Sequence, residues 1–311
     1  MTLDPRARRL LDMLVLSAPA TSVRLTTQQR REGFAKLMQM AARPVAIART
    51  QDLTIPGPGG PLALRLYDPR SPGTKPAPAL VFFHGGGLVA GDLDTHDGVC
   101  RHLANASGTI VIAADYRLAP EARFPAGLID AAFAVDWVAH EAPGLGIDAS
   151  RLAVGGESAG ALLAALIACG HQRASARLKA QLLLCPVIDL AGNAPSREEF
   201  GKGYLIDRDT VERDIEDCLA AGQSAPELPS PLCLAAIGQP PPAIVDIAEC
   251  DPFRDEAEAY VARLREVGVA VERTLHAGMP HAFHGLSALL PQADPALHAA
   301  GRKLAELLSA P

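Results

Sequence analysis

The chain has 311 residues, of which 49% are hydrophobic, and its formal net charge at pH 7 is −6. This composition excludes an intrinsically disordered chain, and an acidic balance without any basic run gives no support to nucleic-acid binding. No apolar segment approaches the ~20 residues that a membrane span needs, and the charged start Met1–Arg9 lacks the apolar core of a signal peptide. We therefore expect a soluble, cytoplasmic protein with one large α/β domain.

The beginning of the chain predicts helices followed by a β-hairpin. Apolar residues recur at helical spacing over residues 4–17 and 26–41, ahead of any strand pattern. Two short strands follow, Leu53–Ile55 and Leu62–Tyr67, and the glycine- and proline-rich stretch between them predicts an antiparallel connection. We expect residues 1–45 to form a helical piece that lies against the main domain.

The rest of the chain alternates between strand and helix patterns. This alternation predicts a mostly parallel sheet with helices on both faces, and the hairpin brings the expected total to eight strands. The further predicted strands are Ala79–His84, Thr109–Asp115, Arg151–Gly155, Gln181–Val187, Ala243–Glu249 and Val271–His276. The helices between and after them are Val99–Ser107, Phe124–His140, Ala159–Cys169, Glu256–Gly268 and Ala296–Leu308.

Residues 189–235 break this alternation with polar stretches and prolines. We expect an insertion there, whose one helical candidate, Asp207–Ala221, lies over the carboxyl ends of the strands. The core domain then consists of residues 46–188 and 236–311. Six cysteines are spread along the chain without a C-x-x-C pair, so we expect buried thiols and neither a disulfide frame nor a zinc site. They are Cys100, Cys169, Cys185, Cys218, Cys233 and Cys250.

The predicted strand Arg151–Gly155 runs directly into the motif Gly156-x-Ser158-x-Gly160. Glycines two residues on either side of a serine permit a tight strand-to-helix turn, which exposes the hydroxyl above the N-terminus of the next helix. The helix dipole and its free amides there face any negative charge that forms nearby. A simple glycine- and serine-rich turn is the alternative, so the remaining catalytic groups must come from elsewhere in the chain.

A second glycine-rich segment, His84-Gly85-Gly86-Gly87, follows another buried strand. Glycines in this place let the backbone pass very close to a bound group with its amides turned outward. A flexible turn is the alternative here.

A serine hydroxyl becomes a nucleophile only when a base takes its proton and an acid orients that base. In sheets of this kind, reactive groups lie on loops after the carboxyl ends of the strands. Asp251 follows the strand Ala243–Glu249, and His281 follows the strand Val271–His276. The resulting order, with Ser158 first, then the acid, then the base, is that of α/β-hydrolases.

Other acids and histidines compete for these roles. We expect Glu249 to remain in its strand, Asp255 to cap or enter the next helix, and Glu157 to be a local structural acid. His276 is expected to end a strand, and His284 lies shortly after the chosen base. The other histidines are expected to be surface or packing residues, namely His96, His102, His140, His171 and His298.

Taken together, these segments resemble the hormone-sensitive lipase family of α/β-hydrolases, the bacterial family IV esterases. The resemblance covers nearly the whole chain. It is carried by His84–Gly87, Gly91–Asp97, Asp115–Glu121, Phe124–Ala126, Gly156–Gly160, Asp251–Glu256 and Gly278–His281.

The resemblance implies the α/β-hydrolase fold, with a cap built from the N-terminal helices and the 189–235 insertion. It implies a catalytic triad of Ser158, Asp251 and His281. It also implies an oxyanion hole formed by the amides of Gly85, Gly86 and Ala159, in a loop that is shaped by His84 and supported by Gly87.

Three positions depart from the family pattern. Glu157 stands where the family more often has Asp or Thr, Ala282 replaces the glycine of the usual His-Gly-Phe, and Ala161 stands where a second glycine is frequent. None of these changes removes a catalytic group, so we expect them to affect pocket shape and loop mobility, not the existence of activity.

The sequence therefore predicts a serine carboxylesterase that hydrolyses short- to medium-chain esters through an acyl-enzyme, the chain length resting on the resemblance. We expect no cofactor and no metal, a small-molecule ester as partner, and neither nucleic acid nor membrane; a homodimer is one assembly that we consider. An amidase, carbamate hydrolase or lactonase would use the same triad. A ligand-binding receptor on a hydrolase scaffold is the alternative from another class, but plant hormone receptors of this family have lost the catalytic histidine, whereas His281 is retained.

Overall fold

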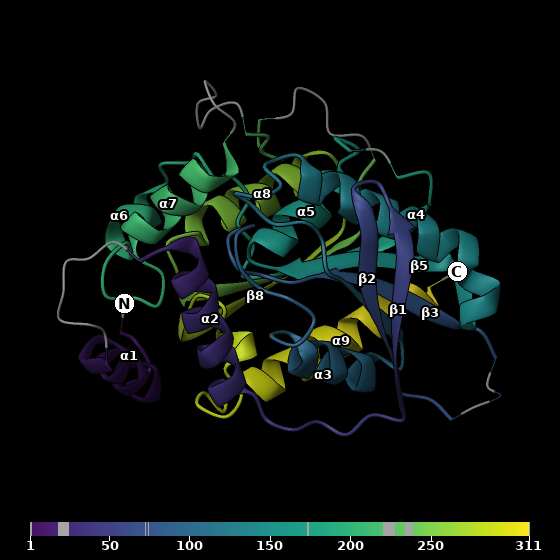
Figure 1. Cartoon of the computed structure of the whole chain (residues 1–311), viewed down its shortest axis with the longest axis horizontal. Coiled ribbons are helices and arrows are strands. Elements are labelled where there is room, and N and C mark those ends of the chain that lie inside the picture. The colour runs from purple at the N-terminus through teal and green to yellow at the C-terminus, as the bar shows by residue number, and fades with distance from the viewer. Residues whose placement is uncertain are drawn as a thin grey trace.

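An eight-stranded sheet forms the centre of the computed structural model, in the order β1-β2-β4-β3-β5-β6-β7-β8 (Figure 1). β2 is antiparallel to both of its neighbours, and every pair from β4 to β8 is parallel. The predicted mostly parallel sheet of eight strands is therefore confirmed. The strands are β1 (Arg49–Gly57), β2 (Gly60–Asp68), β3 (Ala77–Phe83), β4 (Ile110–Ala114), β5 (Ile147–Glu157), β6 (Leu178–Leu184), β7 (Ala243–Cys250) and β8 (Val271–Pro280). The structure describes residues 2–17, 25–71, 73, 75–172, 174–219, 228–233 and 239–310.

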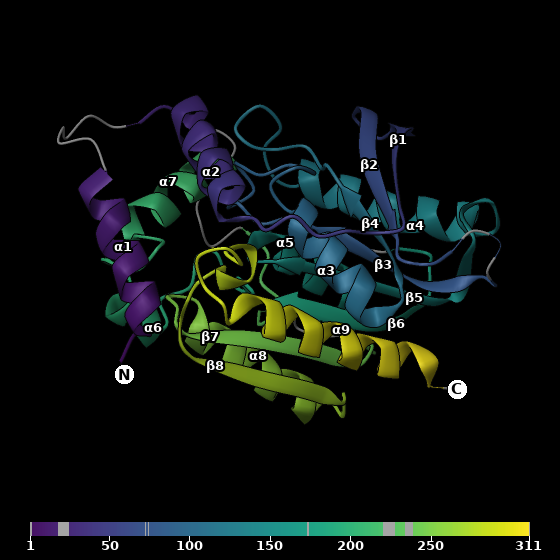
Figure 2. The ribbon, with the colours of Figure 1, turned by 90° about the horizontal axis from the view of Figure 1, so that it is seen from below.

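Helices cover both faces of the sheet. α3 (Asp97–Ser107) and α9 (Ala293–Ser309) lie on one face, and α4 (Ala126–Leu145), α5 (Ala159–Ala168) and α8 (Arg254–Glu266) lie on the other (Figures 1 and 2). None of the helices in the described part of the chain is both long and apolar enough to cross a membrane.

Each face of the sheet has its own hydrophobic core. Successive side chains of a strand point to opposite faces, so Val81 and Phe83 of β3 join the core under α4, α5 and α8, whereas Leu80 and Phe82 join the core under α3 and α9. Every residue of α5 is buried. Burying each large apolar side chain contributes ~1.5–3 kcal/mol, so this helix is firmly held, and its N-terminus is a rigid place for a reactive group.

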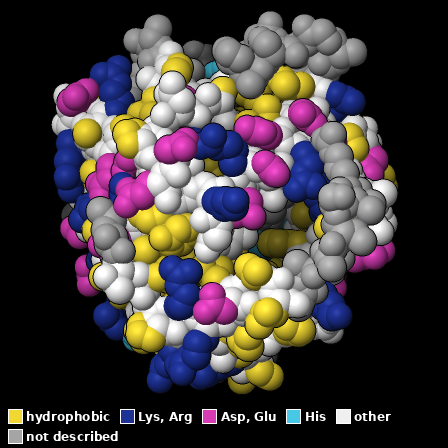
Figure 3. Space-filling view, turned by 90° about the vertical axis from the view of Figure 1, so that its left-hand side faces the viewer, with side chains coloured by type: hydrophobic (Ala, Val, Ile, Leu, Met, Phe, Trp, Pro, Cys, Tyr) yellow, Lys and Arg dark blue, Asp and Glu magenta, His cyan; other side chains and the backbone are white. Residues whose placement is uncertain are grey.

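Four further helices lie together beyond the carboxyl ends of the parallel strands (Figure 1). They are α1 (Pro5–Ser17), α2 (Thr27–Ala41), α6 (Pro195–Glu199) and α7 (Arg208–Cys218). Arg30 of α2 forms ion pairs with Asp214 and Asp217 of α7, which join the start of the chain to the 189–235 segment. On this side of the molecule, hydrophobic side chains gather in patches between charged ones, some at the bottom of a hollow (Figure 3).

The carboxyl ends of two strands differ from the sequence prediction by three residues or more. β6 ends at Leu184 and not at Val187, because Cys185 takes a left-handed conformation (φ 42°) and turns its N–H to the Asp246 carbonyl, at 2.8 Å. β8 continues to Pro280, so the prediction that His276 ends this strand is wrong. A register shift between Ala248 and Cys250 allows the pairing with β7 to resume at Pro280.

Several helix ends also differ. α4 was expected to end at His140, but it continues through Pro143 and ends before Gly146, which has φ 72°. The short helix α6 in the insertion was not predicted. α7 covers Arg208–Cys218 of the predicted Asp207–Ala221 helix, and Ala221 lies outside the described residues. Five of the six cysteines are buried free thiols as expected, and Cys233 is exposed.

Candidate active site

Ser158 lies in the turn between β5 and α5, with φ 55° and ψ −121°. The flanking glycines are required for this turn. A Cβ atom at Gly156 would lie 2.4 Å from the carbonyl carbon of Gly160, and one at Gly160 would lie 2.1 Å from the carbonyl oxygen of Phe83. The Ser158 N–H donates to the Leu184 carbonyl at 2.9 Å, which fixes the turn against β6.

The structure brings Ser158, Asp251 and His281 together in one hydrogen-bonded chain. His281 Nε2 lies 2.8 Å from Ser158 Oγ, and His281 Nδ1 lies 2.7 Å from Asp251 Oδ2. All three residues are at most 5% exposed. The second carboxylate oxygen of Asp251 accepts the Phe253 N–H at 2.7 Å, which holds the carboxylate in the orientation that faces the imidazole.

The charge of Asp251 influences the ionisation of His281. Burial disfavours the charged imidazolium, but the surrounding carboxylates, of which Asp251 contributes most, together raise the pKa of His281 above its usual value of 6.5. Because a hydrogen-bonded carboxylate also fixes the ring orientation, Nε2 is directed at the serine hydroxyl.

The competing acids contact other groups. Glu249 is in β7 as expected, and its side chain accepts the Gly278 N–H at 2.8 Å. Asp255 enters the first turn of α8, one of the two places expected for it, and the N-cap position is Phe253. Its carboxylate accepts the Ser196 N–H of α6 at 2.9 Å, so Asp255 links α8 to α6.

One histidine expected to be a surface or packing residue contacts the glycine-rich loop. His96 is 1% exposed, and its Nε2 lies 3.0 Å from the Gly85 N–H donor and 2.9 Å from Glu157 Oε2. Sequence reasoning missed this role, although His96 belongs to the Gly91–Asp97 segment that carries the family resemblance. Glu157 is a structural acid as expected, with this histidine as its partner.

The same contact bears on the predicted oxyanion hole, which stays a prediction. The Gly85 N–H points at His96 Nε2, 3.0 Å away, and not at the space above Ser158. No hydrogen-bond acceptor is found for the Gly86 and Gly87 amides among the described residues. The Ala159 amide lies at the N-terminus of α5, where helix amides have no partner within the helix.

His84 supports this loop from behind. Its Nδ1–H donates to the Gly85 carbonyl at 2.8 Å, and its ring stacks on Tyr116, with ring centroids 4.3 Å apart. Burial, together with the nearby His96, lowers the pKa of His84 to about 3, so the ring is neutral. The Tyr116 hydroxyl donates to the His84 carbonyl at 2.8 Å. These contacts set the path of the backbone just before the free amides.

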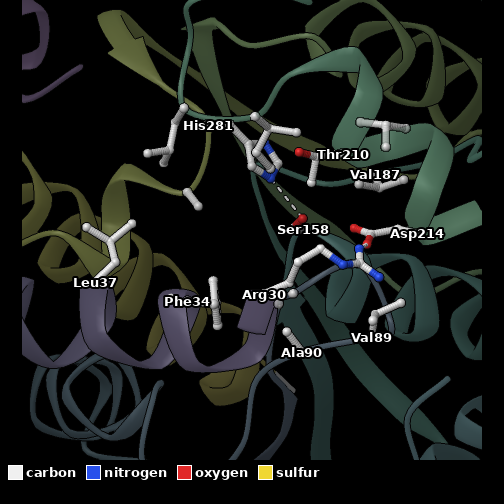
Figure 4. Close-up of a pocket in the computed structure, with 18 of the residues that line it drawn as sticks. Arg30, Phe34, Leu37, Val89, Ala90, Ser158, Val187, Thr210, Asp214 and His281 are labelled. Carbon is white, nitrogen blue, oxygen red and sulfur yellow. Dashed lines mark hydrogen bonds and ion pairs between the residues drawn. The ribbon is translucent and has the colours of Figure 1, made fainter. Parts of the chain in front are cut away.

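Above Ser158 lies a cavity of about 330 Å³. Its walls are mainly apolar and come from both ends of the sequence, with Phe34 and Leu37 on α2, and Val89 and Val187 on core loops (Figure 4). This volume is at the lower end of the ~300–1,000 Å³ that is typical of small-molecule sites.

The cavity also has a polar wall, formed by Arg30 of α2 and by Thr210 and Asp214 of α7 (Figure 4). Burial raises the pKa of Asp214 to about 7, although Arg30 opposes this shift. Asp214 packs so closely on the glycine-rich loop that a Cβ atom at Gly87 would lie 2.0 Å from its Oδ2. A larger residue at this position would have to displace the Asp214 carboxylate and would be strained at φ 68°.

Comparisons with known proteins show the family of the chain. The profile of the family described as alpha/beta hydrolase fold matches residues 80–285. The chain is 40% identical over 246 residues to an ethyl acetate hydrolase of Pseudomonas putida, an alignment that covers 77% of this chain and 76% of that protein.

Solved structures are similar over almost the full length. An ester hydrolase from the metagenome of Lake Arreo superposes with a TM-score of 0.92 at 33% identity, covering 98% of this chain and 99% of that one. An esterase of Pyrobaculum calidifontis superposes with a TM-score of 0.89 at 36% identity, covering 99% of this chain and 100% of that one.

Proposed function

Since the chain belongs to the hormone-sensitive lipase family of α/β-hydrolases and is a carboxylic ester hydrolase, we propose that Ser158, His281 and Asp251 are its catalytic triad. The observation that carries this proposal is the buried chain of two hydrogen bonds, 2.8 and 2.7 Å long, that joins the three side chains at the floor of the cavity.

In acylation, His281 takes the proton of Ser158 Oγ as this oxygen attacks the ester carbonyl carbon. Asp251 stabilises the imidazolium that forms. The imidazolium then gives its proton to the alcohol oxygen, the carbon–oxygen bond of the ester breaks, and the acyl group remains on the serine. In deacylation, water repeats the sequence, with His281 again as base, and the acid product leaves.

The negative charge on the carbonyl oxygen requires preorganised donors. We assign this role to the amides of Gly86 and Ala159, with Gly87 in the place predicted for Gly85. The support for this assignment is the Gly85–His96 contact, which removes one amide from the set, together with the absence of acceptors for the two following amides among the described residues. The N-terminal end of α5 adds a favourable dipole.

We propose that residues 1–45 and the 189–235 insertion form the cap of this enzyme, and that residues 46–188 and 236–311 are its core domain. Phe34 and Leu37 from one part and Thr210 from the other line the cavity, so the cap limits the room for the acyl chain. A cavity of about 330 Å³ suits short- to medium-chain esters. The name of the relative from Pseudomonas putida, ethyl acetate hydrolase, describes an enzyme for a short-chain ester.

The cytoplasmic location of the protein stays a prediction.

The chain-length proposal is tested by measuring kcat/KM for p-nitrophenyl acetate, butyrate, octanoate and palmitate. We expect butyrate to exceed palmitate by at least about tenfold, since excluding a few buried methylenes is enough for such a ratio. Equal rates on palmitate would contradict the assignment of the cavity. Hydrolysis of p-nitrobutyranilide as fast as the ester would favour the amidase alternative.

A further inference from the structure

Three side chains with metal-ligand chemistry, none of which lines the cavity above Ser158, meet beside β7 and β8. They are Asp246 of β7, His276 of β8, and His284 of the short 3-10 turn Phe283–Gly285. His276 Nε2 lies 3.1 Å from Asp246 Oδ2, and His284 Nε2 lies 3.6 Å from the same oxygen. Candidate ligand atoms of all three residues lie within 4.8 Å of one another.

The cluster is buried and its polar atoms are unsatisfied. The side chains of Asp246 and His284 are 2% and 0% exposed, and that of His276 is 15% exposed. Asp246 Oδ1 and the Nε2 atoms of both histidines make no hydrogen bond of acceptable geometry with any described residue. Each histidine Nε2 has only its ion-pair contact with Asp246 Oδ2, and Asp246 Oδ1 has no hydrogen bond among the described residues. Because a buried polar atom without a hydrogen bond costs ~1–3 kcal/mol, these atoms would gain from binding a shared cation.

The spacing fits a particular kind of cation. Zinc binds imidazole nitrogen and carboxylate oxygen at ~2.0–2.2 Å in a tetrahedral arrangement, which places neighbouring ligand atoms about 3.3 Å apart. The distances from Asp246 Oδ2 to His276 Nε2, 3.1 Å, and to His284 Nε2, 3.6 Å, lie on either side of this value. The candidate ligand atoms of the two histidines lie within 4.8 Å of each other. The donor set of two imidazoles and one carboxylate suits zinc better than the hard ions Mg²⁺ and Ca²⁺, which prefer oxygen ligands alone.

The surroundings provide an outer shell and an entry path. Nδ1 of His284 lies 3.6 Å from the thiol sulfur of the buried Cys185, a contact that orients the ring with Nε2 toward Asp246. His276 lines a surface depression together with Arg6, Gln292 and Ala296. An ion can therefore reach the cluster from solvent through the His276 side.

We propose that Asp246, His276 and His284 bind a Zn²⁺ ion with three protein ligands, the fourth position being open to water from the depression. The role is structural, because the site joins β7, β8 and the turn that follows His281. β7 also leads into Asp251, so a bound ion fixes the two elements that carry the proposed base and acid. The site is independent of the ester chemistry, for which no metal is needed.

The test uses the whole chain, from which metal is removed with a chelator before dialysis against zinc chloride. Bound zinc is then measured by inductively coupled plasma mass spectrometry. We expect one zinc per chain. The unfolding midpoint should rise by about 4 °C at a free zinc concentration of 100 times the dissociation constant. With Co²⁺ in place of zinc, the wild type should show the visible absorption bands of a tetrahedral site.

The variant His276→Gln should lose this zinc and the shift in the midpoint, and Asp246→Asn should behave in the same way. The matched control is His102→Gln, because His102 also has its Nε2 near a carboxylate, Asp294, at 3.2 Å, but the two belong to no group of three metal-ligating side chains among the described residues. It should retain the zinc. If the wild type binds no more zinc than His276→Gln and gives no tetrahedral cobalt bands, the cluster is only an Asp–His–His ion-pair network and the proposal is overturned.

Discussion

His281 Nε2 lies 2.8 Å from Ser158 Oγ, although 123 residues separate the two along the chain. The serine is at the end of β5 and the histidine follows β8, and three intervening parallel pairs hold these strand ends at one edge of the sheet. The hydrogen bond is therefore a property of the fold, and it is the geometry that an acyl-transfer mechanism needs before substrate arrives.

The choice of acid is tested by two asparagine variants. Asp251→Asn should lower kcat by on the order of 10⁴-fold, because an amide favours the wrong tautomer of His281. Asp255→Asn keeps an oxygen that can accept the Ser196 N–H but removes the negative charge, so the hydrogen bond is weaker. We expect the free energy of unfolding to fall by ~1 kcal/mol and kcat to stay nearly unchanged. Steady-state kinetics and urea unfolding of both proteins make the comparison. An exchange of the two phenotypes would show that the acid has been misassigned.

The pH dependence of kcat/KM follows from the ionisation of His281. The base must be neutral, so the rate should fall about tenfold per pH unit below its pKa. Because the carboxylates around His281, chiefly Asp251, raise this pKa despite burial, the midpoint of the acid limb should lie above 6.5. In Asp251→Asn the largest of these carboxylate effects is lost, and the residual activity should have a lower midpoint. A higher midpoint in that variant would contradict the proposed pairing.

His96 is expected to position the oxyanion loop without touching substrate. His96→Gln should lower kcat by roughly tenfold to a hundredfold, less than the ~10²–10³ for loss of an oxyanion donor itself, and KM should change little. His102→Gln is the control, because His102 is a partly buried histidine of the neighbouring helix α3 that contacts Asp294 and makes no hydrogen bond to the glycine-rich loop among the described residues. An unchanged kcat in His96→Gln, or an equal loss in the control, would contradict the role of His96.

The sequence could predict the sheet and the three proposed catalytic side chains, because both follow from local pattern and chain order. Glycine spacing defines the turn at Ser158, and in a parallel sheet the loops after β7 and β8 must meet it. The direction of the Gly85 N–H could not be predicted from the sequence. Whether Gly85 N–H points into the pocket depends on His96, which reaches it from eleven residues away, and only the resemblance of the Gly91–Asp97 segment marked this residue at all.

The register between β7 and β8 could not be predicted from the sequence either. The approach of His276 to Asp246 depends on the pairing of Ala248 with His276, and no local pattern contains that information. The irregularity between Ala248 and Cys250 allows β8 to continue to Pro280, where the sequence indicated a loop. Tertiary pairing thus decided the strand end and created the histidine cluster.

Variants of Arg30 test whether its ion pairs couple α2 to α7 in the proposed cap. Arg30→Ala leaves the buried Asp214 without its cation, which should lower the free energy of unfolding by roughly 2–3 kcal/mol, somewhat less than the loss for a fully buried pair. KM for the butyrate ester should rise, because α2 then holds the cavity wall less firmly.

In the double variant with Asp214→Ala, the loss of unfolding free energy should be smaller than the sum of the losses in the two single variants. Arg208→Ala, which breaks an exposed pair with Glu198, should be close to neutral. Additive losses would show that the pair does not couple α2 to α7.

The central claim is that Ser158 is the nucleophile, and its most direct test is covalent labelling with a p-nitrophenyl phosphonate ester, followed by mass spectrometry of the intact protein and its peptides. We predict one phosphonyl group per chain, located on Ser158, with release of one equivalent of nitrophenol. Ser158→Ala should remain folded and unlabelled, with kcat lower by about 10⁴-fold or more. Labelling of another residue, or a Ser158→Ala protein that keeps a tenth of the wild-type rate, would contradict the account.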